Sequence, residues 1–154
     1  MQYLFLDTNL LGELCHPTAE KFKDLKHWAF AILEQSAGET YQLCLPEIVD
    51  YELRRKLLHM ALQQGRNESN SLIRLNNFKK ILRYIPLQTS TMNLAAQIWA
   101  EARLNGLPTT TSSSLDGDVI LAAQAKELNG IVLTTNQKHL SRFVPVADWQ
   151  SFRP

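Results

Sequence analysis

Apolar residues form two kinds of pattern along this chain: short unbroken runs and longer stretches with helical spacing. The short runs are YLFL at 3–6, YQLCLP at 41–46, YIPLQ at 84–88 and IVLTT at 131–135. Runs of this length suit strands that are covered on both faces, as in a parallel sheet. They therefore predict four strands.

The longer stretches place apolar residues three or four positions apart, which is the spacing along one face of a helix. In the stretch 19–36, Leu25 and Trp28 fall on one face, with charged residues between the apolar ones. We predict helices over residues 9–15, 19–36, 46–64, 71–83, 91–105 and 118–128. Gly38 is expected to end the second of them, and six consecutive Thr and Ser residues at 109–114 predict a loop.

The predicted strands alternate with the predicted helices, which is the order of an α/β fold with a mainly parallel sheet. The length of 154 residues fits a single domain over 1–154 and is short for two. A long helical stretch at 46–83 interrupts the alternation.

Composition and charge exclude few functions. With 16 basic and 15 acidic residues the net charge is +1, which neither indicates nor excludes a nucleic-acid partner, although the RRK run at 54–56 makes the middle of the chain locally basic. Cys15 and Cys44 belong to no CxxC or Cys/His cluster, so we expect free, buried thiols in a reducing cytosol. No apolar run is long enough to cross a bilayer, and we expect no signal peptide ahead of the first strand.

Three carboxylates stand at positions where a parallel sheet gathers functional groups. Asp7 ends the first predicted strand, Asp118 opens the helix that leads into the last strand, and Glu52 lies inside the helix 46–64. Because function collects at the carboxyl ends of parallel strands, we expect these acids to converge on one crevice.

Carboxylates that crowd together repel one another, and a divalent cation among them relieves that repulsion. A site with oxygen ligands only selects hard ions such as Mg²⁺ or Mn²⁺, which serve phosphate-ester chemistry. The residues alone therefore predict chemistry on a phosphate ester, with Asp7, Glu52 and Asp118 as catalytic and metal-binding groups. If that ester is a phosphodiester, a water activated by the cation would attack in line and leave a 5′-phosphate and a 3′-hydroxyl.

Each of these residues also has a purely structural interpretation. Asp7 could cap the turn after its strand, Glu52 could be a surface glutamate, and Asp118 could be an N-cap or first-turn acid. The neighbouring polar residues could be caps, turn residues or exposed loop residues: Thr8, Asn9, Asp116, Asn136 and His139. For His139 the exposed-loop interpretation is favoured. Only the joint placement of the acids favours a site.

Four segments together resemble the PIN domain family, in particular the VapC-like toxins of bacterial toxin–antitoxin pairs. They are LDTN at 6–9, YELRR at 51–55, DGDVILAAQA at 116–125 and IVLTTNQKHL at 131–140. The resemblance implies a three-layer α/β/α sandwich with a parallel central sheet. It also implies a Mg²⁺- or Mn²⁺-dependent endoribonuclease in the cytoplasm.

By this resemblance Asp7 matches the first acid of the family, Glu52 the glutamate on a helix, and Asp118 the acid that opens the buried helix. Thr8 or Asn9 matches a small polar position beside the first acid. After the last strand the polar position falls on Asn136, with Thr134 before it. Many members carry a further Asp there, where this chain has Asn136 and His139, and Asp116 is a candidate supporting acid in its stead.

The resemblance further implies RNA as substrate, a homodimer and a small antitoxin whose tail blocks the site. Arg54, Arg55 and Lys56 are candidate contacts to the RNA backbone. Leu57, Leu58 and Leu62 could pair with a second copy, although core positions are the favoured interpretation of these leucines.

Three alternatives stay open. One is a Mg²⁺-dependent DNase on a similar fold. Another is a catalytically weakened domain that binds RNA or protein. The last is a phosphatase with Asp7 as nucleophile, which is disfavoured because its usual second Asp is replaced by Asn9.

Overall fold

The computed structural model describes residues 1–35, 40–106 and 112–154, and a parallel sheet forms its centre. The strands are β1 (Gln2–Leu6), β2 (Tyr41–Pro46), β3 (Arg83–Ile85), β4 (Ile131–Leu133) and β5 (Val146–Ala147), in the order β3-β2-β1-β4-β5. Every neighbouring pair is parallel. The central strand β1 is apolar at successive positions because helices cover both of its faces, and Leu4, Phe5 and Leu6 are fully buried.

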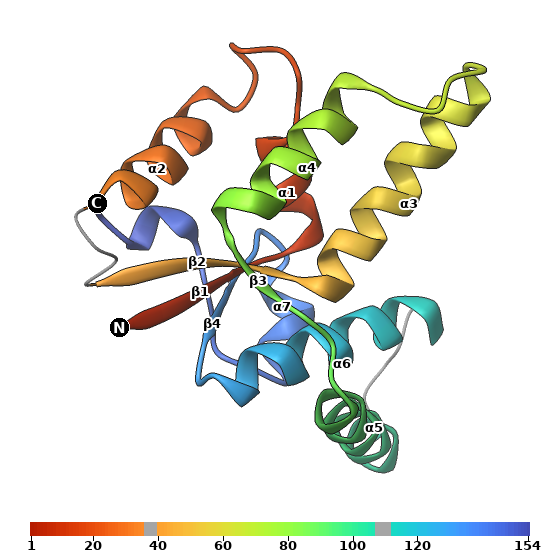
Figure 1. The fold of residues 1–154 in the computed structure, drawn as a ribbon. Helices are drawn as coiled ribbons and strands as arrows, with labels where there is room; N and C mark the ends of the chain where they lie inside the picture. The colour runs from red at the N-terminus through yellow and green to blue at the C-terminus, as the bar shows by residue number, and fades with distance from the viewer. Residues whose placement is uncertain (36–39, 107–111) are drawn as a thin grey trace.

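The helices form two layers, one on each face of the sheet. They are α1 (Thr8–Leu14), α2 (Lys23–Glu34), α3 (Glu47–Gln63), α4 (Asn70–Ile81), α5 (Thr89–Leu104), α6 (Ser112–Glu127), α7 (Gln137–Leu140) and the 3-10 helix η2 (Trp149–Ser151). In Figure 1, α1, α2 and α4 lie above the sheet, and α5 and α6 lie below it. The predicted three-layer α/β/α fold with a parallel sheet is confirmed.

Several boundaries differ from the prediction. The second helix begins at Lys23 rather than at 19, since Phe22 just before it has a left-handed backbone (φ 55°). The strand predicted at 84–88 covers Arg83–Ile85, and β5 was not predicted because two residues carry no periodic signal. Gly38, the predicted end of the second helix, lies outside the described residues.

The helix predicted to open at Asp118 begins at Ser112 instead. The loop predicted over 109–114 is therefore wrong for 112–114, which form the first turn of α6, while 109–111 lie outside the described residues. The first turn consists of polar residues, so the sequence has no apolar periodicity there from which a helix could be predicted. As a result Asp118 lies inside the helix and not at its start.

The helical stretch after β2 is a pair of packed helices, α3 and α4, that share the core through Leu53, Leu75 and Phe78. Leu58 and Leu62 on α3 are 38% and 62% exposed, so their interpretation as core residues is wrong.

The two cysteines, Cys15 and Cys44, are both free and buried, as predicted. Burial raises the pKa of each thiol to about 12. Across the described ranges, no helix combines the length and the apolar character that crossing a membrane requires.

Candidate active site

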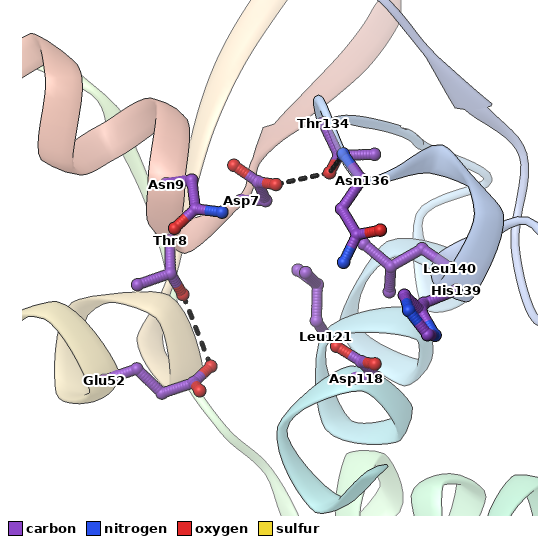
Figure 2. A pocket seen from close by; sticks show the side chains of 10 residues that line it. All are labelled: Asp7, Thr8, Asn9, Glu52, Asp118, Leu121, Thr134, Asn136, His139 and Leu140. Atoms are coloured by element: carbon purple, nitrogen blue, oxygen red, sulfur yellow. Dashed lines mark hydrogen bonds between the residues drawn. The ribbon is translucent and has the colours of Figure 1, made fainter. Parts of the chain in front are cut away.

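One polar cavity lies at the carboxyl ends of β1 and β4. Its lining comes from segments that are far apart in the chain: Asp7, Thr8, Asn9, Glu52, Asp118, Leu121, Thr134, Asn136, His139 and Leu140 (Figure 2). The three carboxylates predicted to converge therefore face one cavity. They come from three different elements, namely the end of β1, the middle of α3 and the second turn of α6.

Asp7 is held by hydrogen bonds to both of its carboxylate oxygens. Oδ1 accepts the Leu10 N–H at 2.8 Å, which caps α1, and Oδ2 accepts the Thr134 hydroxyl across the gap between β1 and β4. Burial raises the pKa of Asp7, and these hydrogen bonds oppose the rise. Capping a helix and facing the cavity are thus combined in one side chain.

Glu52 reaches the cavity from α3, with little to neutralise it. Its Oε1 accepts the Thr8 hydroxyl at 3.4 Å, and the nearest guanidinium nitrogen, Nη2 of Arg55, is 4.0 Å from Oε2. Burial raises the pKa of Glu52, Arg55 and Thr8 lower it, and the charges of Asp118 and Asp7 raise it further. The surface-glutamate interpretation is wrong, because the side chain is only 26% exposed and points inward (Figure 2).

Asp118 faces the cavity from the opposite side, beside His139 (Figure 2). Burial is the main cause of its raised pKa; the charges of His139 and Arg142 oppose the rise, and the charge of Asp7 adds to it. The N-cap and first-turn interpretations are wrong, since α6 begins at Ser112.

The segment after β4 contributes more than expected. Thr134 is 1% exposed, and its Oγ1 accepts the Asn136 N–H at 2.9 Å while its hydroxyl donates to Asp7. His139 is half-buried in the cavity wall, so its interpretation as an exposed loop residue is wrong. The position of His139 shortly after a predicted strand could have revealed this, because functional groups collect at the carboxyl ends of parallel strands. Arg142, whose charge acts on Asp118, was missed altogether.

Not every predicted site residue reaches the cavity. Asp116 lines a separate apolar cleft between α5 and α6, beside Met92 and Trp99. The guanidinium of Arg54 hydrogen-bonds to Asp50 at 3.0 Å and to Asn76 at 2.8 Å.

The other two basic residues of the RRK run differ from Arg54. The side chain of Arg55 is 57% exposed beside Glu52. Lys56 is exposed on α3 and does not line the cavity.

The donors around the cavity suit a hard divalent cation. They are carboxylate, hydroxyl and amide oxygens together with the His139 imidazole, with no thiol among the lining residues. In residues 1–35, 40–106 and 112–154, no three His, Cys, Asp or Glu side chains lie close enough together to hold an ion directly. The fit is thus to a cation bound by one or two carboxylates and, through water, by the rest, which is the usual way that proteins hold Mg²⁺.

Comparison with known proteins finds a family but no curated relative. The PIN domain family model matches residues 4–144. No curated protein sequence matches the chain significantly.

Solved structures share the fold at low sequence identity. VapBC2 from Rickettsia felis, bound to a DNA fragment from its promoter, has a TM-score of 0.69 and 16% identity over 96% of this chain and 99% of that one. FitAcB from Neisseria gonorrhoeae has a TM-score of 0.69 and 20% identity over 97% and 99%. VapC20 from Mycobacterium tuberculosis, a toxin that cleaves the sarcin–ricin loop, has a TM-score of 0.58 and 12% identity over 98% and 99%.

Proposed function

Since this chain belongs to the PIN domain family, we propose that it is a divalent-cation-dependent endoribonuclease and the toxin of a toxin–antitoxin pair. The observation that carries the proposal is the cavity in which Asp7, Glu52 and Asp118 meet. Burial raises the pKa of all three carboxyls. The guanidinium of Arg55, the nearest positively charged side chain to Glu52, is 4.0 Å away. Such an arrangement is unfavourable for the free protein and favourable once a cation enters.

In this proposal Asp7, Glu52 and Asp118 hold one or two Mg²⁺ or Mn²⁺ ions, directly or through water. The cation supplies Lewis-acid stabilisation of the negative charge that develops on the phosphate. Thr134 fixes the orientation of Asp7, and Thr8 does the same for Glu52.

A carboxylate of the three accepts the proton of the attacking water. The water oxygen bonds to phosphorus as the bond from phosphorus to the 3′-oxygen breaks, and the departing 3′-oxygen takes up a proton from solvent, which leaves a 5′-phosphate and a 3′-hydroxyl. Asn9 and Asn136, whose side chains point into the cavity in Figure 2, supply neutral donors for the substrate phosphate.

RNA is the proposed substrate, in a single-stranded or loop region. The fold is shared with VapC20, which is described as cleaving the sarcin–ricin loop. Bases in a single-stranded or loop region are accessible without a duplex groove, so an open cavity suits RNA of that kind. Of the three basic residues on α3, Arg55 is best placed to contact the RNA backbone, since it is exposed beside Glu52.

We also propose a small antitoxin as partner, a homodimer, action in the cytoplasm, and one nuclease domain that spans the chain. The structural neighbours VapBC2 and FitAcB support an antitoxin by the names of their complexes. The exposed apolar residues Leu58 and Leu62 on α3 support a protein contact.

The test is cleavage of RNA and DNA oligomers of one sequence with MgCl₂, comparing wild type, Asp7→Asn and Asp116→Asn. We expect RNA cleavage by wild type and by Asp116→Asn, whose acid lies outside the cavity, and none by Asp7→Asn. Equal cleavage rates for wild type and Asp7→Asn would contradict the proposed mechanism. Preferential cleavage of DNA would show that the protein is a DNase and not a ribonuclease.

A second candidate function is an RNA-binding module without catalysis. It is favoured by the spacing of the acids, no three of which are close enough to hold an ion directly within the described residues. Fluorescence anisotropy with a labelled RNA in EDTA separates the two. Tight binding in EDTA, with no cleavage after MgCl₂ or MnCl₂ is added, would favour the module.

A further inference from the structure

Gly117 stands directly before Asp118, in the interior of α6, and is buried. Glycine is among the least favourable residues in a helix interior, because it loses the most backbone freedom on folding. The positive-φ glycines in the described part of the chain are Gly65 and Gly106, so the backbone at Gly117 is one that alanine adopts easily. Another reason must therefore account for a glycine here.

The reason lies across the helix interface. A Cβ built on Gly117 would stand 2.9 Å from Oε2 of Glu52, 3.1 Å from its Cδ and 3.1 Å from its Oε1. Real Cβ atoms do not approach other heavy atoms as closely as the first of these distances. All three of the nearest atoms belong to one carboxylate, so a methyl group at this position would meet the head of Glu52.

We propose that Gly117 is a positioning residue: its missing side chain leaves the space in which the Glu52 carboxylate lies against α6, next to Asp118. The inference rests on the proposed function, because it assigns Gly117 a role through a site carboxylate. The contact joins α3 to α6, so the glycine brings acids from two helices to one cavity. Without that space Glu52 would move away from Asp118.

The glycines elsewhere show why this effect falls on the site and not on the fold. At Gly130 a Cβ would stand 2.4 Å from the Phe5 ring and 3.2 Å from the backbone oxygen of Tyr3, so alanine there would disturb the sheet. At Gly117 the clash is with the far end of a flexible side chain that can rotate away. Its rotation would also break the hydrogen bond from the Thr8 hydroxyl to Glu52.

The first test is the affinity of the full chain for MnCl₂ by titration calorimetry, with RNA cleavage and thermal unfolding measured alongside. We expect Gly117→Ala to lose affinity by about 10- to 100-fold, the range seen when the groups that orient a metal ligand are removed. Its melting temperature should stay at the wild-type value or rise. Gly12→Ala is the matched control, since it also lies in a helix against α3, and its Cβ would meet only Leu53 Cδ1 at 3.5 Å, an ordinary contact. Manganese affinity in Gly117→Ala equal to that of Gly12→Ala would overturn the inference.

A double-mutant cycle tests whether the effect passes through Glu52. The substitution Glu52→Asp shortens the side chain by one methylene and draws the carboxylate back from α6. In that background Gly117→Ala should change MnCl₂ affinity by less than about 3-fold, since interacting sites are not additive. An equal loss in both backgrounds would show that Gly117 acts in some other way, and would also overturn the inference.

The inference can fail separately from the proposed function. A crystal structure of Gly117→Ala shows directly whether the Glu52 carboxylate has moved, even if wild type cleaves no RNA. A displaced carboxylate supports the inference, and an unmoved carboxylate overturns it. Absence of cleavage by wild type with either ion counts against the nuclease and leaves the steric claim to the crystal structure.

Discussion

Two acids on α3, only two positions apart, are held in opposite ways. Asp50 is 5% exposed, with Arg54 Nη2 at 2.9 Å, Lys79 Nζ at 3.8 Å and the Tyr84 hydroxyl at 3.1 Å from its carboxylate oxygens. Glu52 points to a different face of the helix and has one distant arginine and one long hydrogen bond. The first acid is surrounded by cations and the second faces other acids across the cavity.

The difference teaches how to separate a structural acid from a functional one. A buried charge that is paired and hydrogen-bonded on all sides has no use for a ligand, and removing it leaves its partners stranded. A buried charge with few partners costs stability until something binds to it. Both acids are partly or wholly shielded from water, so the groups around each carboxylate distinguish them better than burial does.

The largest effect is expected from Asp118→Asn. RNA cleavage with MgCl₂ should fall by about 10²-fold or more, as when a charge-stabilising group is lost from an active site. The free energy of unfolding at pH 7 should stay unchanged or rise, because burial disfavours the charged form of this side chain. Single-turnover cleavage and urea unfolding check the two parts. A fall in stability together with activity would place Asp118 with Asp50 as a structural acid.

The next effect is expected from Asp50→Asn, in the opposite sense. Removing the charge leaves Arg54 and Lys79 without their acid, but both remain partly exposed to water. We expect a loss of about 2 kcal/mol in the free energy of unfolding, below the full cost of breaking a buried pair. Urea unfolding measures it. Cleavage per folded molecule should match wild type. A loss of cleavage without loss of folded protein would contradict the assignment of Asp50 as a structural acid.

A smaller effect is expected from Thr134→Val, which removes the hydroxyl between Asp7 and the Asn136 N–H. The substitution keeps the shape of the side chain and leaves Asp7 unoriented. We expect cleavage to fall by about 10-fold, in the lower range for a group that orients a metal ligand. The rate at saturating MgCl₂ is the measurement, with Thr134→Ser as the control that keeps the hydroxyl. Equal losses in both variants would assign the effect to packing.

The smallest effect is expected from pH. The raised pKa values of Asp7, Glu52 and Asp118 mean that the folded chain binds protons at a pH where the unfolded chain does not. Their contribution to stability therefore increases as the pH falls from 7 toward the raised pKa values, in the absence of divalent cations. Urea unfolding in EDTA between pH 7 and pH 5 checks this. Asp118→Asn should flatten the dependence, since it removes one of the three groups with a raised pKa; an unchanged slope would contradict this assignment.

The fold was largely predictable because its elements have clear signals of their own. The apolar run at Tyr41–Pro46 matches β2 at both ends, and its last four residues are all buried. The start of α6 was missed because its first turn is polar, and β5 is too short to show a pattern. Both failures concern segments that carry no apolar periodicity of their own.

The candidate site was predictable as far as topology reaches. Strand order alone brings Asp7 toward the strand that Thr134 follows, and a buried helix carries Asp118 to the same edge. The roles of His139 and Gly117 in the site depend on contacts between residues of different helices or strands. Sequence spacing carries no such information between residues as distant as Glu52 and Gly117.

The hydrogen bond from Thr134 to Asp7 joins two residues 127 positions apart. During synthesis Asp7 and Glu52 leave the ribosome well before β4 has been made. Until then, β1 has no strand to pair with on that side. A growing chain thus carries scattered acids and no assembled site. For the proposed nuclease, this order of synthesis means that no site able to act on RNA would exist until the last strands join the sheet.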